Sequence, residues 1–384
     1  MKRASRLTNL PPYPFALWSA EVARARQRGL DVIRLDIGNP DLAPPGVVID
    51  TLCDSAREAA HHGYAGYRGI PALRQAIAAY YARRFGVALD AGSEVVPLIG
   101  SKEGIVNLAL AMLDPGDLVL VPDPGYAPYA MGTLLAGADV VTFPLLAEHD
   151  FLPALEEIPA DVADRAVMMW LNYPNNPTGA VADLSFLAKA VAFAHAHNTL
   201  ICFDAPYADV TYDGYVAPSI LEVAGARDVA IEFNSLSKTY NMAGWRMGMA
   251  VGNAEVLASL AQVKSNVDSG MFQPLQEAAA RALAVDQDWI AERNALYRER
   301  LVLLVDSLSE LGLGVSMPRA ALYAWARVPD GQDAEALARR WLTEAGVAVA
   351  PGGFFGPSGH AYVRVSITAP PSRIEEAVDR LKRL

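Results

Sequence analysis

Short apolar runs alternate with amphipathic segments of helical length along the middle of the chain, and this alternation constrains the fold more than any other feature. It is the pattern of βαβ units, in which parallel strands form a sheet and the intervening helices cover it. A helix is expected, for example, at residues 185–197. Strands are expected at residues 95–99, 118–121, 140–143, 167–171, 200–203, 229–233 and 247–251. The sequence therefore predicts an α/β fold with a mainly parallel sheet.

The pattern changes after about residue 275. One long helical stretch is expected through Leu311, followed by strands at residues 321–327 and 362–368, a helix at residues 333–345 and a final helix. Since 384 residues exceed what one hydrophobic core usually covers, two domains are expected. We predict a large α/β domain at residues 46–275, and a smaller α+β domain formed by residues 1–45 and 276–384.

The N-terminal arm of this smaller domain is rich in proline and carries an expected helix at residues 18–28. It folds either onto the small domain or onto a partner subunit. Pro11, Pro12 and Pro14 interrupt any apolar segment after the basic N-terminus, and no run of 18 apolar residues follows. We therefore expect neither export nor a membrane span.

Composition narrows the class of function. Thirty-two basic and 43 acidic residues give a net charge of -11, which disfavours a general role on nucleic acid or on an anionic membrane. Any anionic substrate must therefore be met by local arginines. The two cysteines, Cys53 and Cys202, offer neither a disulfide framework nor metal-ligand spacing. We expect a cytoplasmic protein without a metal site.

Polar residues follow several of the expected strands, where an α/β sheet binds its ligands. A Gly-Ser turn with Ser101 and Lys102 precedes a helix and would present backbone amides to a phosphate. Tyr126 comes after another strand and could stack on a ligand ring, although tyrosines after turns are often at the surface. The turn-rich loop 172–179 includes Asn176, which is placed to face the same ligand.

The segment SLSKTYNMAGWRMG, residues 235–248, suggests what this ligand is. An aldehyde cofactor needs an amine with which to form an imine, and its phosphate needs hydroxyl donors and a planar cation. Lys238 could supply the amine, Ser235 and Ser237 the hydroxyls, and Arg246 the cation. A lysine in a polar segment is usually a solvated loop residue. However, Lys238 follows a strand end and is the best placed of the six lysines.

Asp204 ends an apolar strand, either as a turn or capping residue or as the partner of a cofactor ring nitrogen. A carboxylate beside the nitrogen of pyridoxal phosphate keeps that ring protonated and electron-accepting. Tyr207 could donate to the ring hydroxyl oxygen, which Asn176 could share. Arg364 lies in a strand and is either a solvated outward residue or a bidentate partner for a substrate carboxylate. The sequence leaves these two readings of Arg364 open.

Together these segments resemble the class I and II aminotransferases, pyridoxal-phosphate enzymes of fold type I, over nearly the whole chain. Within that family the likeness is strongest to LL-diaminopimelate aminotransferases. The fold implied is a large domain whose seven-stranded sheet is sandwiched by helices, plus a smaller α+β domain. The matching segments are residues 35–41, 64–71, 100–104, 172–179, 204–207, 235–248 and 362–364.

The resemblance implies a role for each candidate residue. Lys238 would be the Schiff-base lysine and proton shuttle, Asp204 would face the pyridine nitrogen, and Tyr126 would stack on the ring. Arg364 would bind the substrate α-carboxylate with help from Asn176 and the Gly38 backbone. Residues implied to hold the phosphate are Ser101, Lys102, Ser235, Ser237 and Arg246, with Tyr64 reaching the phosphate of a neighbouring subunit.

The implied activity is transamination by a ping-pong mechanism between an amino acid and a 2-oxo acid, in a homodimer with shared active sites. LL-2,6-diaminopimelate, with 2-oxoglutarate and glutamate as the partner pair, is the expected substrate. Aspartate, alanine and aromatic amino acids remain alternatives, as does β-elimination by a carbon-sulfur lyase of the same fold. A cofactor-sensing regulator is disfavoured, because no DNA-binding module precedes the first core motif.

Overall fold

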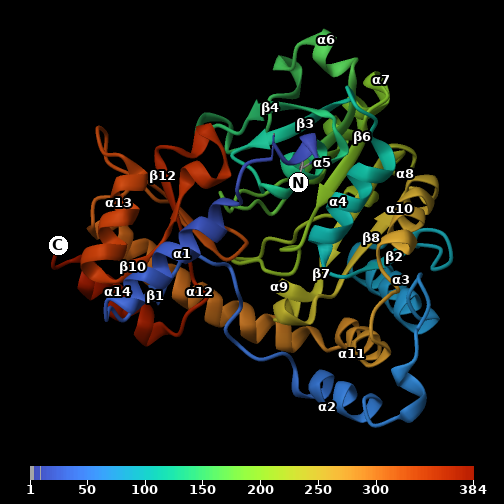
Figure 1. Cartoon of the computed structure of the whole chain (residues 1–384), viewed down its shortest axis with the longest axis horizontal. Coiled ribbons are helices and arrows are strands. Elements are labelled where there is room, and N and C mark those ends of the chain that lie inside the picture. The colour runs from blue at the N-terminus through green and yellow to red at the C-terminus, as the bar shows by residue number, and fades with distance from the viewer. Residues whose placement is uncertain (1–3, 9) are drawn as a thin grey trace.

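The computed structural model describes residues 4–8 and 10–384. Its centre is a sheet with the strand order β2-β8-β7-β6-β5-β3-β4 (Figure 1). Strand β8 is antiparallel to both neighbours, and the other adjacent pairs are parallel. The strands are β2 (Val95–Leu98), β3 (Leu118–Asp123), β4 (Asp139–Pro144), β5 (Ala166–Asn172), β6 (Leu200–Asp204), β7 (Ala230–Ser235) and β8 (Gly248–Gly252). The predicted mainly parallel sheet is confirmed.

Both faces of this sheet are covered by helices, because successive side chains of a strand point to opposite sides. In β5, Met169 and Leu171 pack into one core, and Met168 and Trp170 pack into the other. Helices α3 (Pro71–Phe85), α7 (Leu184–His197) and α11 (Gln273–Leu283) contribute to the first core. Helices α4 (Ser101–Met112), α5 (Pro128–Ala136) and α10 (Ala254–Val267) contribute to the second.

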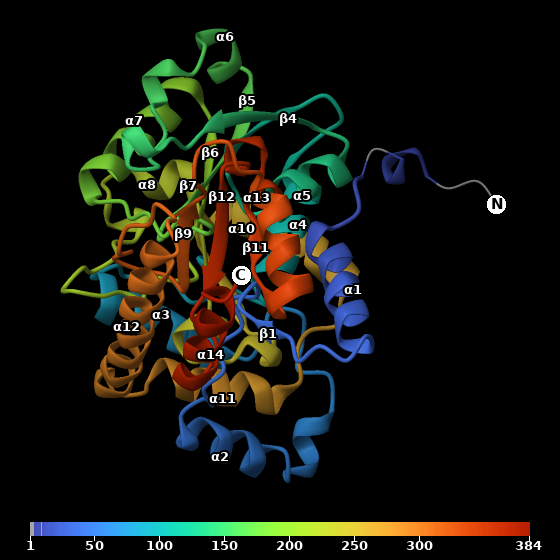
Figure 2. The same cartoon turned by 90° about the vertical axis from the view of Figure 1, so that its left-hand side faces the viewer.

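A separate core lies in the C-terminal part of the chain and includes Trp18 and Val22 of the N-terminal helix. Figure 2 shows that helix, in blue, beside the red C-terminal elements. The strands around this separate core form the sheet β11-β12-β9 and the parallel pair β1-β10. The elements are α1 (Pro14–Gln27), β1 (Ile33–Arg34), α12 (Gln287–Glu310), β9 (Tyr323–Arg327), α13 (Ala334–Arg340), β10 (Val347–Ala348), β11 (Ala350–Pro351), β12 (Tyr362–Ser366) and α14 (Pro371–Leu381).

The prediction of one long helical stretch through Leu311 is wrong, because the chain turns between α11 and α12. Asp286 caps α12 by accepting a hydrogen bond from the backbone N–H of Asp288. Helix α11 packs on α2 (Gly46–Ser55) and α3, whereas α12 packs on α14 and β9. The break therefore lies where the chain passes from one core to the other, and in Figure 1 the orange α12 makes this passage.

The first helix begins at Pro14, earlier than the predicted residue 18, since proline is compatible with the first turn of a helix. Short α-helices also connect strands of the large sheet: α6 (Ala160–Ala163), α8 (Ala226–Val229) and α9 (Leu236–Thr239). Among the described residues, no helix combines the length and the apolar composition needed to cross a membrane.

Candidate active site

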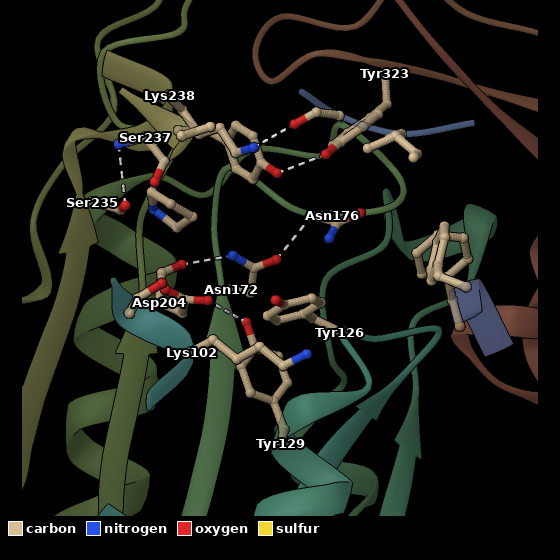
Figure 3. A pocket seen from close by; sticks show the side chains of 18 of the residues that line it. Lys102, Tyr126, Tyr129, Asn172, Asn176, Asp204, Ser235, Ser237, Lys238 and Tyr323 are labelled. Atoms are coloured by element: carbon tan, nitrogen blue, oxygen red, sulfur yellow. Dashed lines mark hydrogen bonds between the residues drawn. The ribbon is translucent and has the colours of Figure 1, made fainter. Parts of the chain in front are cut away.

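A cavity of about 340 Å³ opens beyond the carboxyl ends of the central strands, where polar side chains converge (Figure 3). Asn172 ends β5, Asp204 ends β6 and Ser235 ends β7. The structure brings nearly all of the predicted site residues into its lining. They are Gly38, Ser101, Lys102, Tyr126, Asn176, Asp204, Tyr207, Ser235, Ser237, Lys238, Arg246 and Arg364.

Lys238 points into this cavity from the short helix α9. The Ser235 side chain caps the helix by accepting a hydrogen bond from the Ser237 backbone N–H, and the Lys238 ammonium donates to the carbonyl oxygen of Gly38. Burial, together with the positive charges of Arg364 and Arg246, lowers the pKa of Lys238 to about 7. A substantial fraction of the amine is therefore neutral near pH 7 and able to act as a nucleophile or a base.

Asp204 lies fully buried at the end of β6, below the cavity. Its Oδ2 accepts a hydrogen bond of 2.6 Å from the Tyr129 hydroxyl, and the Tyr129 ring stacks on Trp170 at 4.6 Å. Its Oδ1 has no hydrogen-bond partner within the described part of the chain. Burial raises the pKa of Asp204 to about 7, while the Tyr129 hydrogen bond acts in the opposite direction.

A buried carboxylate with an unsatisfied oxygen is costly unless a ligand pairs with it. The protonated ring nitrogen of pyridoxal phosphate is a cationic donor that would satisfy Asp204 Oδ1. On this observation the residues present fit the cofactor that the sequence predicts.

Arg364 is 3% exposed, so its strand position is not the outward, solvated one. Its guanidinium donates to Asn176 Oδ1 at 2.5 Å and to the Asp36 carbonyl oxygen at 2.7 Å. The faces of Tyr323 and Phe355 lie 4.0 and 4.7 Å from it, within cation–π range. Among the described residues its Nε lacks a hydrogen-bond partner, which leaves a donor for a further anion.

Four basic side chains line one cavity of a protein whose net charge is -11: those of Lys102, Lys238, Arg246 and Arg364. This local concentration of positive charge suits a ligand with both phosphate and carboxylate groups. Burial lowers the pKa of Lys102, with Arg246 adding to the effect. The Lys102 ammonium lies 4.3 Å from the Tyr13 ring centroid.

The turn before α4 brings backbone close to the Arg246 guanidinium. Gly100 has φ 72° and ψ 155°, and a side chain there would overlap with Arg246. Of the two predicted hydroxyl donors, Ser235 already donates to the Met247 carbonyl oxygen at 3.2 Å. No partner for the Ser237 hydroxyl is found in the described part of the chain, so this hydroxyl is the freer donor.

Tyr64 is the predicted site residue that does not line this cavity; it is 91% exposed. Other lining residues were not singled out from the sequence. Tyr129 lies in the first turn of α5, three residues after Tyr126, which precedes the helix, and this closeness in sequence could have identified it. Four aromatic residues reach the cavity from the N-terminal arm or from the C-terminal part of the chain, and no local sequence pattern distinguishes them. They are Tyr13, Phe15, Tyr323 and Phe355. Among the described residues, no cluster of His, Cys, Asp or Glu could hold a metal ion.

Comparison with known proteins identifies the family of this chain. The family model described as aminotransferase class I and II matches residues 30–381. The LL-diaminopimelate aminotransferase of Moorella thermoacetica is 48% identical over 100% of this chain and 98% of its own length. The enzyme of the same name from Desulforudis audaxviator is 51% identical, over 99% of this chain and 97% of its own.

Solved structures are similar to this chain over its full length. A substrate-bound BacF structure from Bacillus subtilis superposes with a TM-score of 0.96 at 36% identity, covering 100% of this chain and 98% of that one. A mutant of the Thermus thermophilus aspartate aminotransferase gives a TM-score of 0.92 at 30% identity, covering 100% and 99% of the two chains. With the family model matching most of its length, this chain belongs to the class I and II aminotransferases, and it is a pyridoxal-phosphate-dependent transaminase.

Proposed function

We propose that this aminotransferase moves the amino group of LL-2,6-diaminopimelate to and from a 2-oxo acid by a ping-pong mechanism, with 2-oxoglutarate and glutamate as the partner pair. The observation that carries the reaction is the convergence of Lys238, Asp204 and Arg364 on one cavity. The choice of substrate is supported by full-length relatives of 48% and 51% identity that are named for it.

Pyridoxal phosphate supplies an aldehyde and an electron-accepting ring. Lys238 is proposed to bond to that aldehyde and, once displaced by the substrate amine, to carry a proton to and from the substrate α-carbon. Its lowered pKa suits both tasks, because the same amine must accept and release a proton near neutral pH. Asp204 holds the hydrogen of the ring nitrogen at its free Oδ1.

The remaining residues orient the reactants. Arg364 binds the α-carboxylate, held in place by Asn176, and Tyr207 donates to the ring hydroxyl oxygen beside Asn176. Tyr126 covers the ring, and the Gly38 carbonyl receives the Lys238 ammonium when the amine is free. The phosphate group is held by Ser101, Lys102, Ser235, Ser237 and Arg246. Because Ser235 is already engaged with Met247, Ser237 is expected to be the stronger of the two serine donors.

A homodimer is part of this proposal. Tyr64 and Tyr67 are 91% and 57% exposed, and Val267 and Phe272 are 63% and 40% exposed. These two segments are adjacent, because the backbone at Gly66 lies against Gly270. An exposed apolar patch of this kind is typical of a protein interface. We propose that it packs on a second copy and brings Tyr64 to the partner's phosphate.

The domain limits and the location of the protein are proposed as well. The two cores support a division into a large and a small domain, predicted as residues 46–275, and residues 1–45 with 276–384. Because α11 packs in the core of the central sheet, we propose that the boundary lies between α11 and α12. Cys53 and Cys202 are both free thiols, which supports a reducing cytoplasm.

The test is a set of single half-reactions. Purified holoenzyme is mixed with LL-diaminopimelate, aspartate, alanine or an aromatic amino acid, and the change in cofactor absorbance is followed in each mixture. The proposal predicts the highest kcat/KM for LL-diaminopimelate, with amino transfer to 2-oxoglutarate completing the cycle. A higher value for another donor would reject the substrate, and release of pyruvate from cystathionine without an oxo acid would favour the lyase.

A further inference from the structure

Tyr323 contacts three of the residues to which a role in the site has been proposed. It lies on β9 and is 2% exposed, and its hydroxyl oxygen is 2.8 Å from that of Tyr207. The guanidinium of Arg364 lies 4.0 Å from its ring centroid. A Cβ on Gly38 would lie only 2.6 Å from Tyr323 Cζ, so the hydroxyl packs directly on that glycine. In Figure 3 a dashed line marks this hydrogen bond at the hydroxyl of Tyr323.

In the hydrogen bond between Tyr207 and Tyr323, only one of the two hydroxyls can be the donor at a time. A phenol hydroxyl has one hydrogen to donate. Within residues 4–8 and 10–384, neither hydroxyl has another hydrogen-bond partner. If Tyr207 donates to Tyr323, its hydrogen is used and it cannot donate to a ligand. If Tyr323 donates instead, the hydrogen of Tyr207 stays free.

The surroundings of the two hydroxyls favour Tyr323 as the donor. Its hydroxyl is enclosed by Gly38 and Tyr207, so that in the described structure Tyr207 is the acceptor within its reach. The positive charge of Arg364 over its ring draws electron density from the phenol and strengthens it as a donor. Both tyrosines line the cavity, but Tyr207 is the one that follows the end of β6, where Asp204 lies.

We infer that Tyr323 is a positioning residue for the cofactor: it donates its hydroxyl hydrogen to Tyr207 and thereby leaves the Tyr207 hydrogen directed at the ring hydroxyl oxygen of pyridoxal phosphate. The inference deepens the proposed function and rests on the role given there to Tyr207. Tyr323, which belongs to the core of the C-terminal part of the chain, would thus help to set the electronic state of the cofactor.

The test is a pH titration of the holoenzyme without substrate. The absorbance of pyridoxal phosphate bound to Lys238 reports the proton on the lysine–cofactor bond, which the ring oxygen helps to hold. A hydrogen bond donated to that oxygen weakens its hold on the proton and lowers the apparent pKa. Tyr323→Phe keeps the ring against Arg364 and removes only the hydroxyl. The Tyr207 hydroxyl then loses the hydrogen bond that orients and polarises it, so the apparent pKa should rise by about half a pH unit or less, a part of the shift expected for Tyr207→Phe.

A double-mutant cycle separates this effect from a general loss of structure. Tyr207→Phe should raise the apparent pKa by itself, and Tyr323→Phe should add nothing in that background. Tyr212→Phe is the matched control, because Tyr212 is buried in the same core and its hydroxyl donates to the Ala321 carbonyl oxygen at 2.7 Å. Its titration should equal that of the wild type. Circular dichroism establishes that each variant is folded.

Two results would overturn the inference about Tyr323 and leave the role of Tyr207 intact. One is an unchanged apparent pKa in Tyr323→Phe when Tyr207→Phe changes it. The other is the same change from Tyr323→Phe in the wild type and in Tyr207→Phe. An unchanged titration in Tyr207→Phe would reject the proposed role of Tyr207, and the inference with it. The half-reactions described above do not depend on either result, so the failure of transamination itself is recognised separately.

Discussion

Gly100 offers a direct test of how the phosphate end of the site is built. It joins β2 to α4 with φ 72° and ψ 155°, a backbone region that is essentially restricted to glycine. A Cβ at this position would lie 2.7 Å from Arg246 Cζ, inside van der Waals contact. Gly100→Ala must therefore strain the turn, displace the Arg246 guanidinium, or both.

The expected size of the effect follows from these two terms. Backbone strain in this region costs about 1–3 kcal/mol, which should appear as a lower free energy of unfolding of the apoenzyme. A hydrogen bond from a guanidinium to a charged group is worth about 1.5–3 kcal/mol. Loss of that contact should weaken binding of pyridoxal phosphate about 10- to 100-fold. Equilibrium titration of apoenzyme with the cofactor, followed by protein fluorescence, measures the change.

Gly86→Ala is the matched control. Gly86 ends α3 with φ 68°, and a Cβ there would meet nothing within 4 Å. Its substitution should cost about 1–2 kcal/mol of stability through strain alone and leave cofactor affinity unchanged. If Gly100→Ala loses stability yet binds pyridoxal phosphate as tightly as Gly86→Ala, the assignment of Arg246 to the phosphate is refuted.

Three further outcomes are expected. Burial raises the pKa of Glu232 from 4.5 to about 7, so the stability it contributes below pH 4.5 is lost as the pH rises through 7. In Glu232→Gln the free energy of unfolding should decrease by about 3 kcal/mol less than in the wild type as the pH rises from 4.5 to above 7, as measured by urea unfolding. An equal decrease in the variant and the wild type would contradict this. Arg364→Lys should raise the KM for the amino donor about tenfold or more, because the bidentate carboxylate contact is lost, and an unchanged KM would reject that contact. Mixing Tyr64→Phe with Lys238→Ala should restore activity that neither variant has alone, since one shared site of the mixed dimer is intact; no recovery after verified subunit exchange would argue against shared sites.

Much of the fold was predictable because buried parallel strands form short apolar runs with clear ends. Strands such as β5 and β6 lie within about two residues of their expected positions, and the polar residues after them converge as predicted. The break between α11 and α12 was not predicted. The amphipathic pattern continues through the turn, and only Asp286 marks the new helix start.

The site residues that come from the C-terminal part of the chain were the least predictable. Tyr323 reaches Tyr207 because β9 pairs with β12, in a register that sets Arg364 opposite Trp325. That pairing depends on contacts between residues distant in the sequence, and no local pattern encodes it. The burial of Arg364 is a consequence of the same packing, which explains why its strand could be read in two ways.

The central claim is that pyridoxal phosphate bonds to Lys238, and reductive labelling tests it most directly. Holoenzyme is treated with sodium borohydride, which makes the lysine–cofactor bond permanent, and the protein is digested and its peptides are analysed by mass spectrometry. The account predicts the reduced cofactor on the peptide that contains Lys238, with the other five lysines unlabelled. A label on Lys102 or Lys264, or no label on a protein that still transaminates, would contradict it.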